Sequence, residues 1–144
     1  MRVRALFLIV CIALITLSAC GPWRLRVPRA SGGVAFSGVE TVYSPEIPAD
    51  RLRLLDRLGI PGAMSEALRL AYPAGPGPHL RLVITQFRAG RYGPGRLHGV
   101  AEVLDGSGAV VGQAECDATT IRGNRRAKVR ILAQACVDQI ASQL

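Results

Sequence analysis

The first twenty residues constrain the fold most, because they separate a targeting segment from the segment that folds. Arg2 and Arg4 precede an apolar run from Ala5 to Leu17, and small residues then lead to Cys20. A basic start, a short apolar centre and a small-residue end are typical of a secretory signal. The sequence therefore predicts a signal peptide over residues 1–19 and a chain that folds after export.

Two alternatives for this stretch stay open. One is an uncleaved membrane anchor, although the run of 13 residues is shorter than the roughly 20 residues that a spanning helix needs. Arg24, Arg26 and Arg29 also follow too soon to extend it. The other alternative is an ordinary buried helix. The layout favours cleavage over both.

The 125 residues that cleavage would leave are enough for one domain with a hydrophobic core. Loss of Arg2 and Arg4 would lower the net charge from +8 to +6, since residues 1–19 hold no acid. A cationic exported protein is attracted to anionic headgroups and lipopolysaccharide phosphates. The arginines are spread along the chain, however, which favours a charge that simply solvates the surface.

Two segments read as irregular. Residues 21–33 combine prolines, glycines and arginines without periodicity, and they predict a flexible tether. Residues 73–78 have the sequence Pro-Ala-Gly-Pro-Gly-Pro, which predicts a connector without helix or strand.

Helices are expected in two places. Leu52, Leu55 and Leu58 begin a helical pattern over residues 49–72 that breaks or kinks at 59–62, where glycine and proline interrupt it. A second helix is expected to begin at Gly123-Asn124 and to run to about residue 143, with apolar residues at spacings of three and four.

Strands are predicted over residues 34–43, 79–87, 97–104 and 109–121 from their β-branched and apolar content. In the second of these, Leu80, Leu82 and Ile84 share one face, and Phe87 falls on the other. The short connections between the last three strands favour an antiparallel meander. The predicted fold is one α+β domain over residues 34–144, with helices packed on one face of an antiparallel sheet of about four strands as a two-layer sandwich.

Two cysteines of the expected domain make a candidate disulfide. Alternation places Cys116 on the small apolar face of the last strand, and Cys136 lies on the apolar stripe of the last helix. An exported protein can keep such a bridge. Two buried, unpaired thiols that act as small hydrophobic residues are the alternative.

The basic residues of the second half include a candidate anion-binding set. These are Arg91 and Arg96 in a loop, with Arg125, Arg126, Lys128 and Arg130 in the first turns of the last helix. The cations in the first turns of the helix are unfavourable next to the positive end of its dipole, which suggests that they have a function. A solvated helix start is the simpler interpretation, and the sequence favours it.

No residue pattern points to catalysis or to a cofactor. His79 and His98 lack metal-ligand spacing, and Ser107 lies in a predicted hairpin turn rather than a nucleophile elbow. Neither a metal site nor an enzyme is therefore expected. The pI of about 10.4 brings nucleic acid into consideration, but the export signal and the lack of interleaved aromatic residues argue against it.

The tetrapeptide Leu17-Ser18-Ala19-Cys20 resembles the lipobox of bacterial lipoproteins. That resemblance implies cleavage before Cys20, a diacylglycerol on its sulfur and an acyl chain on its new amine. Residues 20–33 would then be the lipidated cysteine and its tether. Among lipoproteins, a residue other than aspartate after the cysteine implies the outer membrane rather than the inner one, and Gly21 fits that rule.

The order of expected elements resembles that of small bacterial lipoproteins whose domain runs strand, helix, strands, helix. Leu80–Phe87, Val103–Val111 and Val137–Ala141 carry this likeness, all in the second half of the chain. More distantly, the layout is similar to that of the lipopolysaccharide-assembly lipoprotein, which partners an outer-membrane barrel. The resemblance implies a non-enzymatic accessory or assembly component with an envelope protein partner. The alternative is a binder of anionic envelope lipid or glycan through the basic set.

Overall fold

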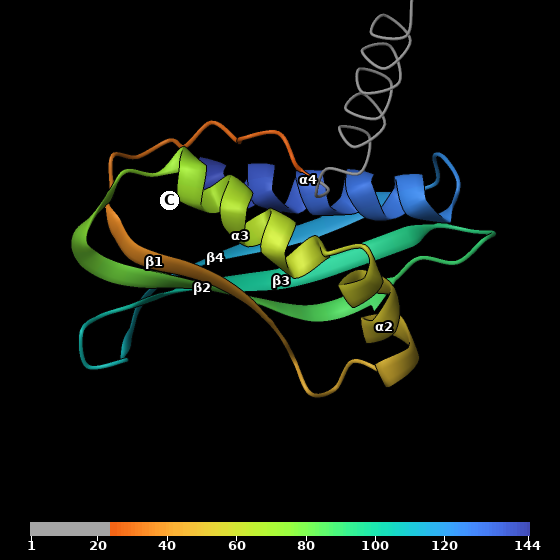
Figure 1. Ribbon diagram of the computed structural model, residues 1–144, viewed down its shortest axis with the longest axis horizontal. Coiled ribbons are helices and arrows are strands. Elements are labelled where there is room, and N and C mark those ends of the chain that lie inside the picture. Colours follow the sequence, from red (N-terminus) through yellow and green to blue (C-terminus); the bar gives the residue numbers. More distant parts are fainter. Residues whose placement is uncertain (1–23) are drawn as a thin grey trace, which may run out of the picture.

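The computed structural model describes residues 24–144, so the predicted signal peptide and Cys20 lie outside the described residues. Four strands form one sheet in the order β1-β2-β3-β4, and Figure 1 shows α3 and α4 on the same face of it. The α+β class is therefore confirmed. The elements are β1 (Phe36–Tyr43), α2 (Ala49–Arg57), α3 (Ile60–Ala71), β2 (Ala74–Arg88), β3 (Gly95–Leu104), β4 (Val110–Thr120) and α4 (Arg125–Gln143).

The sheet is mixed, so the prediction of a purely antiparallel sheet is wrong. β1 pairs with β2 in parallel, with Thr41 opposite Leu82 and Tyr43 opposite Ile84. The other two pairings are antiparallel. The two helices between β1 and β2 form a crossover that returns the chain to the same end of the sheet, which is the connection a parallel pair requires.

The predicted connector at residues 73–78 is also wrong, because β2 begins at Ala74. Pairing of β2 with β3 starts only at His79 opposite Leu104, so the preceding prolines extend beyond the end of β3 and lose no ladder bond on that side. The chain of residue 35 lies close on the other side. A Cβ on Gly77 would lie 2.5 Å from the carbonyl oxygen of Ala35, so glycine permits this approach.

A bulge changes the phase of β2. Leu80, Leu82 and Ile84 are fully buried, as their alternation predicts. The register then shifts between Ile84 and Gln86, which brings Phe87 onto the buried face opposite Leu97, with only 2% of its surface exposed. The prediction for Phe87 is wrong because one inserted residue reverses the alternation.

Gly59 separates α2 from α3, within the predicted break. It adopts the left-handed conformation with φ of 63°, and Pro61 follows in the first turn of α3, where its missing N–H has no helical acceptor to lose. The buried residues of α3, among them Ile60, Met64 and Leu68, face the sheet. Between Arg24 and Leu144, no helix is long and apolar enough to cross a membrane.

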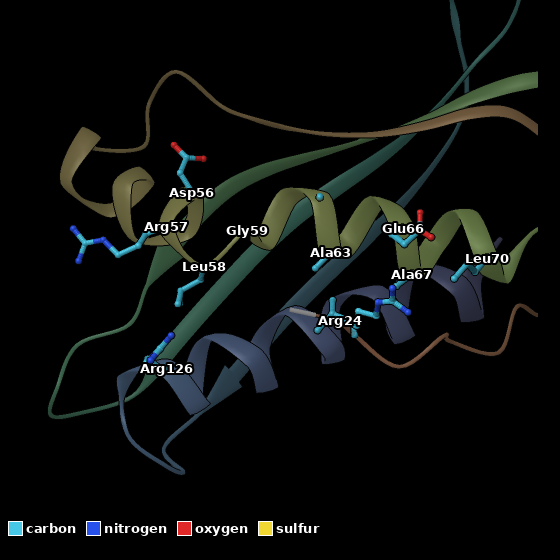
Figure 2. A pocket seen from close by; sticks show the side chains of 12 residues that line it. Arg24, Asp56, Arg57, Leu58, Gly59, Ala63, Glu66, Ala67, Leu70 and Arg126 are labelled. Carbon is cyan, nitrogen blue, oxygen red and sulfur yellow. The ribbon is translucent and has the colours of Figure 1, made fainter. Parts of the chain in front are cut away.

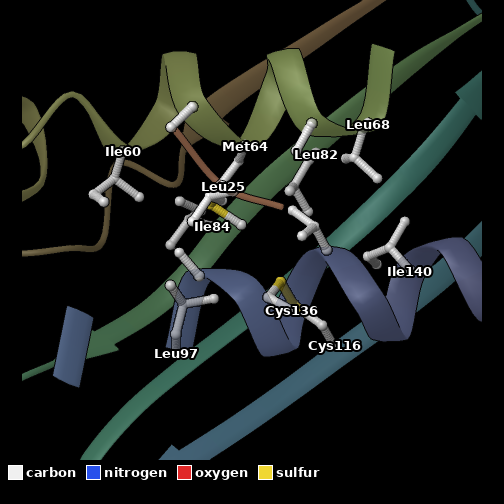
Figure 3. Close-up of a cluster of buried hydrophobic side chains, with 14 of the residues drawn as sticks. Leu25, Ile60, Met64, Leu68, Leu82, Ile84, Leu97, Cys116, Cys136 and Ile140 are labelled. Carbon is white, nitrogen blue, oxygen red and sulfur yellow. A yellow bond between two sulfur atoms is a disulfide. The ribbon is translucent and has the colours of Figure 1, made fainter. Parts of the chain in front are cut away.

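A disulfide joins Cys116 of β4 to Cys136 of α4 inside the core. Both residues are fully buried, and Figure 3 shows the bond among the apolar side chains between the helices and the sheet. It ties the last helix to the last strand at the point where Leu82 and Ile140 also pack in the core cluster.

Two glutamines of α4 cover the free edge of β4. The amide of Gln139 accepts from the Asp117 N–H at 2.8 Å and donates to its carbonyl at 3.3 Å. The amide of Gln143 does the same for Glu115, at 3.1 and 2.6 Å. An edge strand otherwise offers these groups to another chain, so the two side chains protect this edge.

We expect the double substitution Gln139→Ala and Gln143→Ala to uncover that edge. The backbone N–H groups of Glu115 and Asp117 would lose their acceptors, and their amide protons should exchange faster with solvent than in the unmodified chain. Hydrogen–deuterium exchange of β4 peptides measures this. The variant Gln113→Ala serves as the control, because no hydrogen bond of its side chain is present in residues 24–144. Unchanged exchange in the double variant would contradict the assigned role.

Candidate ligand-binding groove

The structure does not gather the six predicted anion-binding residues into one site. Lys128 is 3% exposed, and its Nζ donates to the carbonyl of Gly93 at 2.8 Å and that of Gly90 at 3.4 Å. Arg125 donates from Nε to the carbonyl of Ala89 at 2.9 Å. These two cations hold the loop between β2 and β3 against α4.

The remaining members of the set are dispersed. Arg96 makes a two-pronged ion pair with Asp117, from Nε at 3.0 Å and from Nη2 at 2.8 Å, which lowers the pKa of that carboxyl. Arg91 lies over the ring of Tyr92 in the loop, 5.7 Å from its centroid. Arg130 lies farther along α4. Arg126 alone lines the groove described next.

A groove of about 680 Å³ lies where α2, α3, the start of α4 and residues 24–25 meet. Figure 2 shows α3 along one side and α4 along the other. Its lining consists of Arg24, Leu25, Asp56, Arg57, Leu58, Gly59, Gly62, Ala63, Glu66, Ala67, Leu70 and Arg126.

The apolar part of the groove comes mainly from one stripe of α3. Ala63, Ala67 and Leu70 recur at intervals of four and three and so share a face of the helix, and Gly62 and the charged Glu66 lie beside them. The alanines project little into the groove. Leu25 and Leu58 form its floor, and each is 8% exposed. Leu70 at the far end of the stripe is 54% exposed. The described residues 24–144 thus leave an apolar surface open along α3.

Three arginines from distant parts of the sequence line the groove. Arg24 precedes the first strand, Arg57 ends α2 and Arg126 lies in the first turn of α4. None of their side chains makes a hydrogen bond or an ion pair with another of the residues 24–144. Figure 2 shows Arg57 and Arg126 toward one end, on either side of Leu58, with Arg24 nearer the middle.

The two acidic residues that line the groove have partners of their own. Glu66 accepts hydrogen bonds from Arg69 at 2.8 and 2.9 Å, which lower the pKa of Glu66, and the charge of Arg24 adds to the effect. Asp56 accepts a hydrogen bond from the hydroxyl of Tyr43 at 2.8 Å. Burial, followed by this contact, raises the pKa of Tyr43 above its usual value. Glu66 thus stays ionised, and its charge is largely offset by that of Arg69.

Part of the predicted tether, from residue 24 to residue 31, lies along α4. The backbone of Arg26 exchanges two hydrogen bonds with the amide of Gln134, at 2.8 and 3.0 Å, and its guanidinium pairs with Asp138 at 3.1 Å. The N–H of Ser31 donates to the carbonyl of Ala141 at 2.9 Å. Burial of Leu25 anchors the start of the segment. This contact builds one wall of the groove.

Sequence reasoning missed the groove, although it named Arg126. The stripe of small residues on α3 was a signal that the sequence contains, because glycine and alanine project little from a helix and leave room beside it. The docking of Arg24 and Leu25 against α4 had no local signal. Across residues 24–144, no group of three or more His, Cys, Asp or Glu side chains is placed to hold a metal ion.

Comparisons with known proteins give structural likeness only. No family model matches the chain, and no curated protein matches it. Two solved structures of a PelC dodecamer from Paraburkholderia phytofirmans share 18% identity, with TM-scores of 0.49 and 0.48; they cover 80% and 77% of this chain, and 95% and 93% of theirs. Protein XCC0632 from Xanthomonas campestris, attributed to DUF330, shares 11% identity at a TM-score of 0.49, covering 85% of this chain and 89% of its own. At these identities and scores the likeness assigns neither a family nor an activity to this chain.

Proposed function

We propose that this protein is a non-enzymatic component of the cell envelope that is lipid-anchored at Cys20 and binds a partner in the groove between α3 and α4. The observation that carries the proposal is the groove along the apolar stripe of α3, bordered by three arginines whose side chains make no ion pair with any of the residues 24–144. A surface that is apolar, concave and rimmed by charge is typical of a binding site.

The predicted anchor supports the same assignment. The segment from Arg24 onward lies along α4 and lines the groove, so an attachment at Cys20 would hold the groove close to the membrane. The lipobox sequence and Gly21 favour the periplasmic face of the outer membrane. An accessory or assembly role for an envelope protein partner follows from the family resemblance, and an anionic lipid or glycan is the alternative.

Blocking the groove should abolish partner capture while leaving the fold intact. Gly62 lines the groove, and a Cβ there meets no atom within 4 Å, so Gly62→Trp would place a ring in the open space. A photo-crosslinking residue at Leu70 should form an ultraviolet-induced adduct with an envelope component in intact cells. We expect Gly62→Trp to remove that adduct.

Two controls make this test specific. Gly106→Trp lies in the turn between β3 and β4, where an added Cβ also meets no atom within 4 Å, and it should leave the adduct unchanged. A crosslinker at Val111, which is 61% exposed on β4, should give no such adduct. Equal adducts at Leu70 and Val111, or an adduct that survives Gly62→Trp, would contradict the groove as the binding site.

A further inference from the structure

The groove combines two kinds of surface that one ligand class would match. Its stripe on α3 is apolar and runs toward Leu70, whereas Arg57 and Arg126 lie toward the opposite end (Figure 2). An apolar chain that follows the stripe would therefore carry its polar end to these two arginines. Burial of the apolar chain and charge-assisted contacts to the polar end would act together.

The charges favour an anionic end group. Arg57 and Arg126 are exposed and make no ion pair with any of the residues 24–144, so neither charge is already neutralised. Of the two acids in the groove, Glu66 pairs with Arg69, and Asp56 accepts a hydrogen bond from the hydroxyl of Tyr43. Guanidinium groups bind phosphate and carboxylate oxygens through paired hydrogen bonds. A zwitterionic or neutral end group would gain less at this end.

The position of the groove in the chain favours a lipid as the source. Arg24, in the wall of the groove, follows the predicted lipidation site Cys20 by four residues. Four residues of extended chain span at most about 14 Å. An anchored protein therefore keeps this groove within reach of the headgroup layer.

From these three observations, and resting on the proposed function, we infer that the groove holds one anionic membrane phospholipid. One of its two acyl chains lies on Leu25, Ala63, Ala67 and Leu70, and its phosphate is bound by Arg57 and Arg126. This site differs from the predicted basic set, since Arg57 and the apolar stripe were not part of that set. The bound lipid is a ligand in addition to the lipid attached at Cys20.

The test uses the full chain purified from membranes in a nonionic detergent and native mass spectrometry. We expect one dioctanoyl-phosphatidylglycerol to be retained per chain, with dioctanoyl-phosphatidylcholine at least about tenfold weaker. Glycerol 3-phosphate, which has the anionic group without acyl chains, should not compete. The double variant Arg57→Glu and Arg126→Glu should lose at least about tenfold in affinity for the anionic lipid, and Gly62→Trp should lose binding.

A control variant with the same change in net charge separates the site from general attraction. Arg88 and Arg122 lie outside the groove and make no side-chain hydrogen bond or ion pair with the described residues, so Arg88→Glu with Arg122→Glu should bind as the unmodified chain does. Equal losses in both double variants would overturn the inference, as would equal binding of the two lipids or competition by glycerol 3-phosphate.

The fate of the proposed function is read separately. A Leu70 adduct that contains a protein, together with no retained phosphatidylglycerol, would overturn the lipid inference and leave the partner-binding groove standing. If the Leu70 adduct persists in the Gly62→Trp variant and that variant still retains the lipid, the lipid lies elsewhere on the chain. That result would overturn both the proposed function and the lipid inference.

Discussion

Replacing Cys116 and Cys136 together by alanine is expected to lower the free energy of unfolding by about 3 kcal/mol. The bridge closes a loop with a sequence separation of 20. Cross-linking a loop of this size lowers the conformational entropy of the unfolded chain, which raises its free energy by about 3 kcal/mol. For a domain of this length the melting temperature should fall by roughly 10 °C. Thermal unfolding followed by circular dichroism, with and without reductant, measures the effect.

Reductant supplies the matched control for this prediction. The unmodified chain should melt near the alanine variant when it is reduced, and the variant itself should not respond to reductant. Alkylation before reduction gives an independent measurement, since bridged cysteines take no label. Two cysteines that are labelled freely, or a variant as stable as the unmodified chain, would contradict the structural role of the bridge.

The elements that the sequence predicted correctly keep a regular spacing of apolar residues. β4 alternates strictly from Ala114 to Ala118, and α4 keeps its apolar residues at spacings of three and four. The faces of Cys116 and Cys136 could therefore be assigned from the pattern. The hairpin at Asp105 was equally local, because the chain reverses there through hydrogen bonds between Asp105 and Ala109. The spacing of apolar residues predicts which face is buried where no contact with a distant segment interrupts that spacing.

The errors come from contacts between distant segments. Prolines in residues 73–78 argue against a strand in general, but here the strand extends past its neighbour and needs no hydrogen-bond donor on that side. The bulge before Gln86 has no signature in the alternation that it disrupts. The parallel pairing of β1 depends on a crossover of two helices, whose destination the sequence does not encode locally. Each of these is decided by tertiary packing.

The groove follows the same division. Arg126 belongs to a visible basic cluster, and the small residues of α3 follow a helical period, so both were within reach of the sequence. Arg24 and Arg57 gain their place only when residues 24–33 bind along α4 and when the chain turns at Gly59. The predicted basic set does not form one site, because neighbouring residues of α4 point to different places. Arg125 and Lys128 bind the loop between β2 and β3, whereas Arg126 lines the groove.

Lys128→Ala is expected to destabilise the fold by about 2–3 kcal/mol, since hydrogen bonds from a charged donor contribute about that much in total. The side chain is 3% exposed and donates to the carbonyls of Gly90 and Gly93, and its aliphatic stem is buried with it. Thermal unfolding measures the loss, and hydrogen–deuterium exchange should show faster exchange confined at first to the loop of residues 89–94.

Comparison with Arg126→Ala separates the two roles that adjacent basic residues have here. Lys128 holds the loop, so its removal should lower the melting temperature and leave phosphatidylglycerol retention by the folded chain unchanged. Arg126 lies in the groove without an ion pair to the described residues, so its removal should weaken lipid retention and leave the melting temperature unchanged. Lys128→Met, which keeps most of the buried stem, should recover part of the stability. If Lys128→Ala instead weakened lipid binding at unchanged stability, the basic start of α4 would act as a single anion site and the loop contact would be incidental.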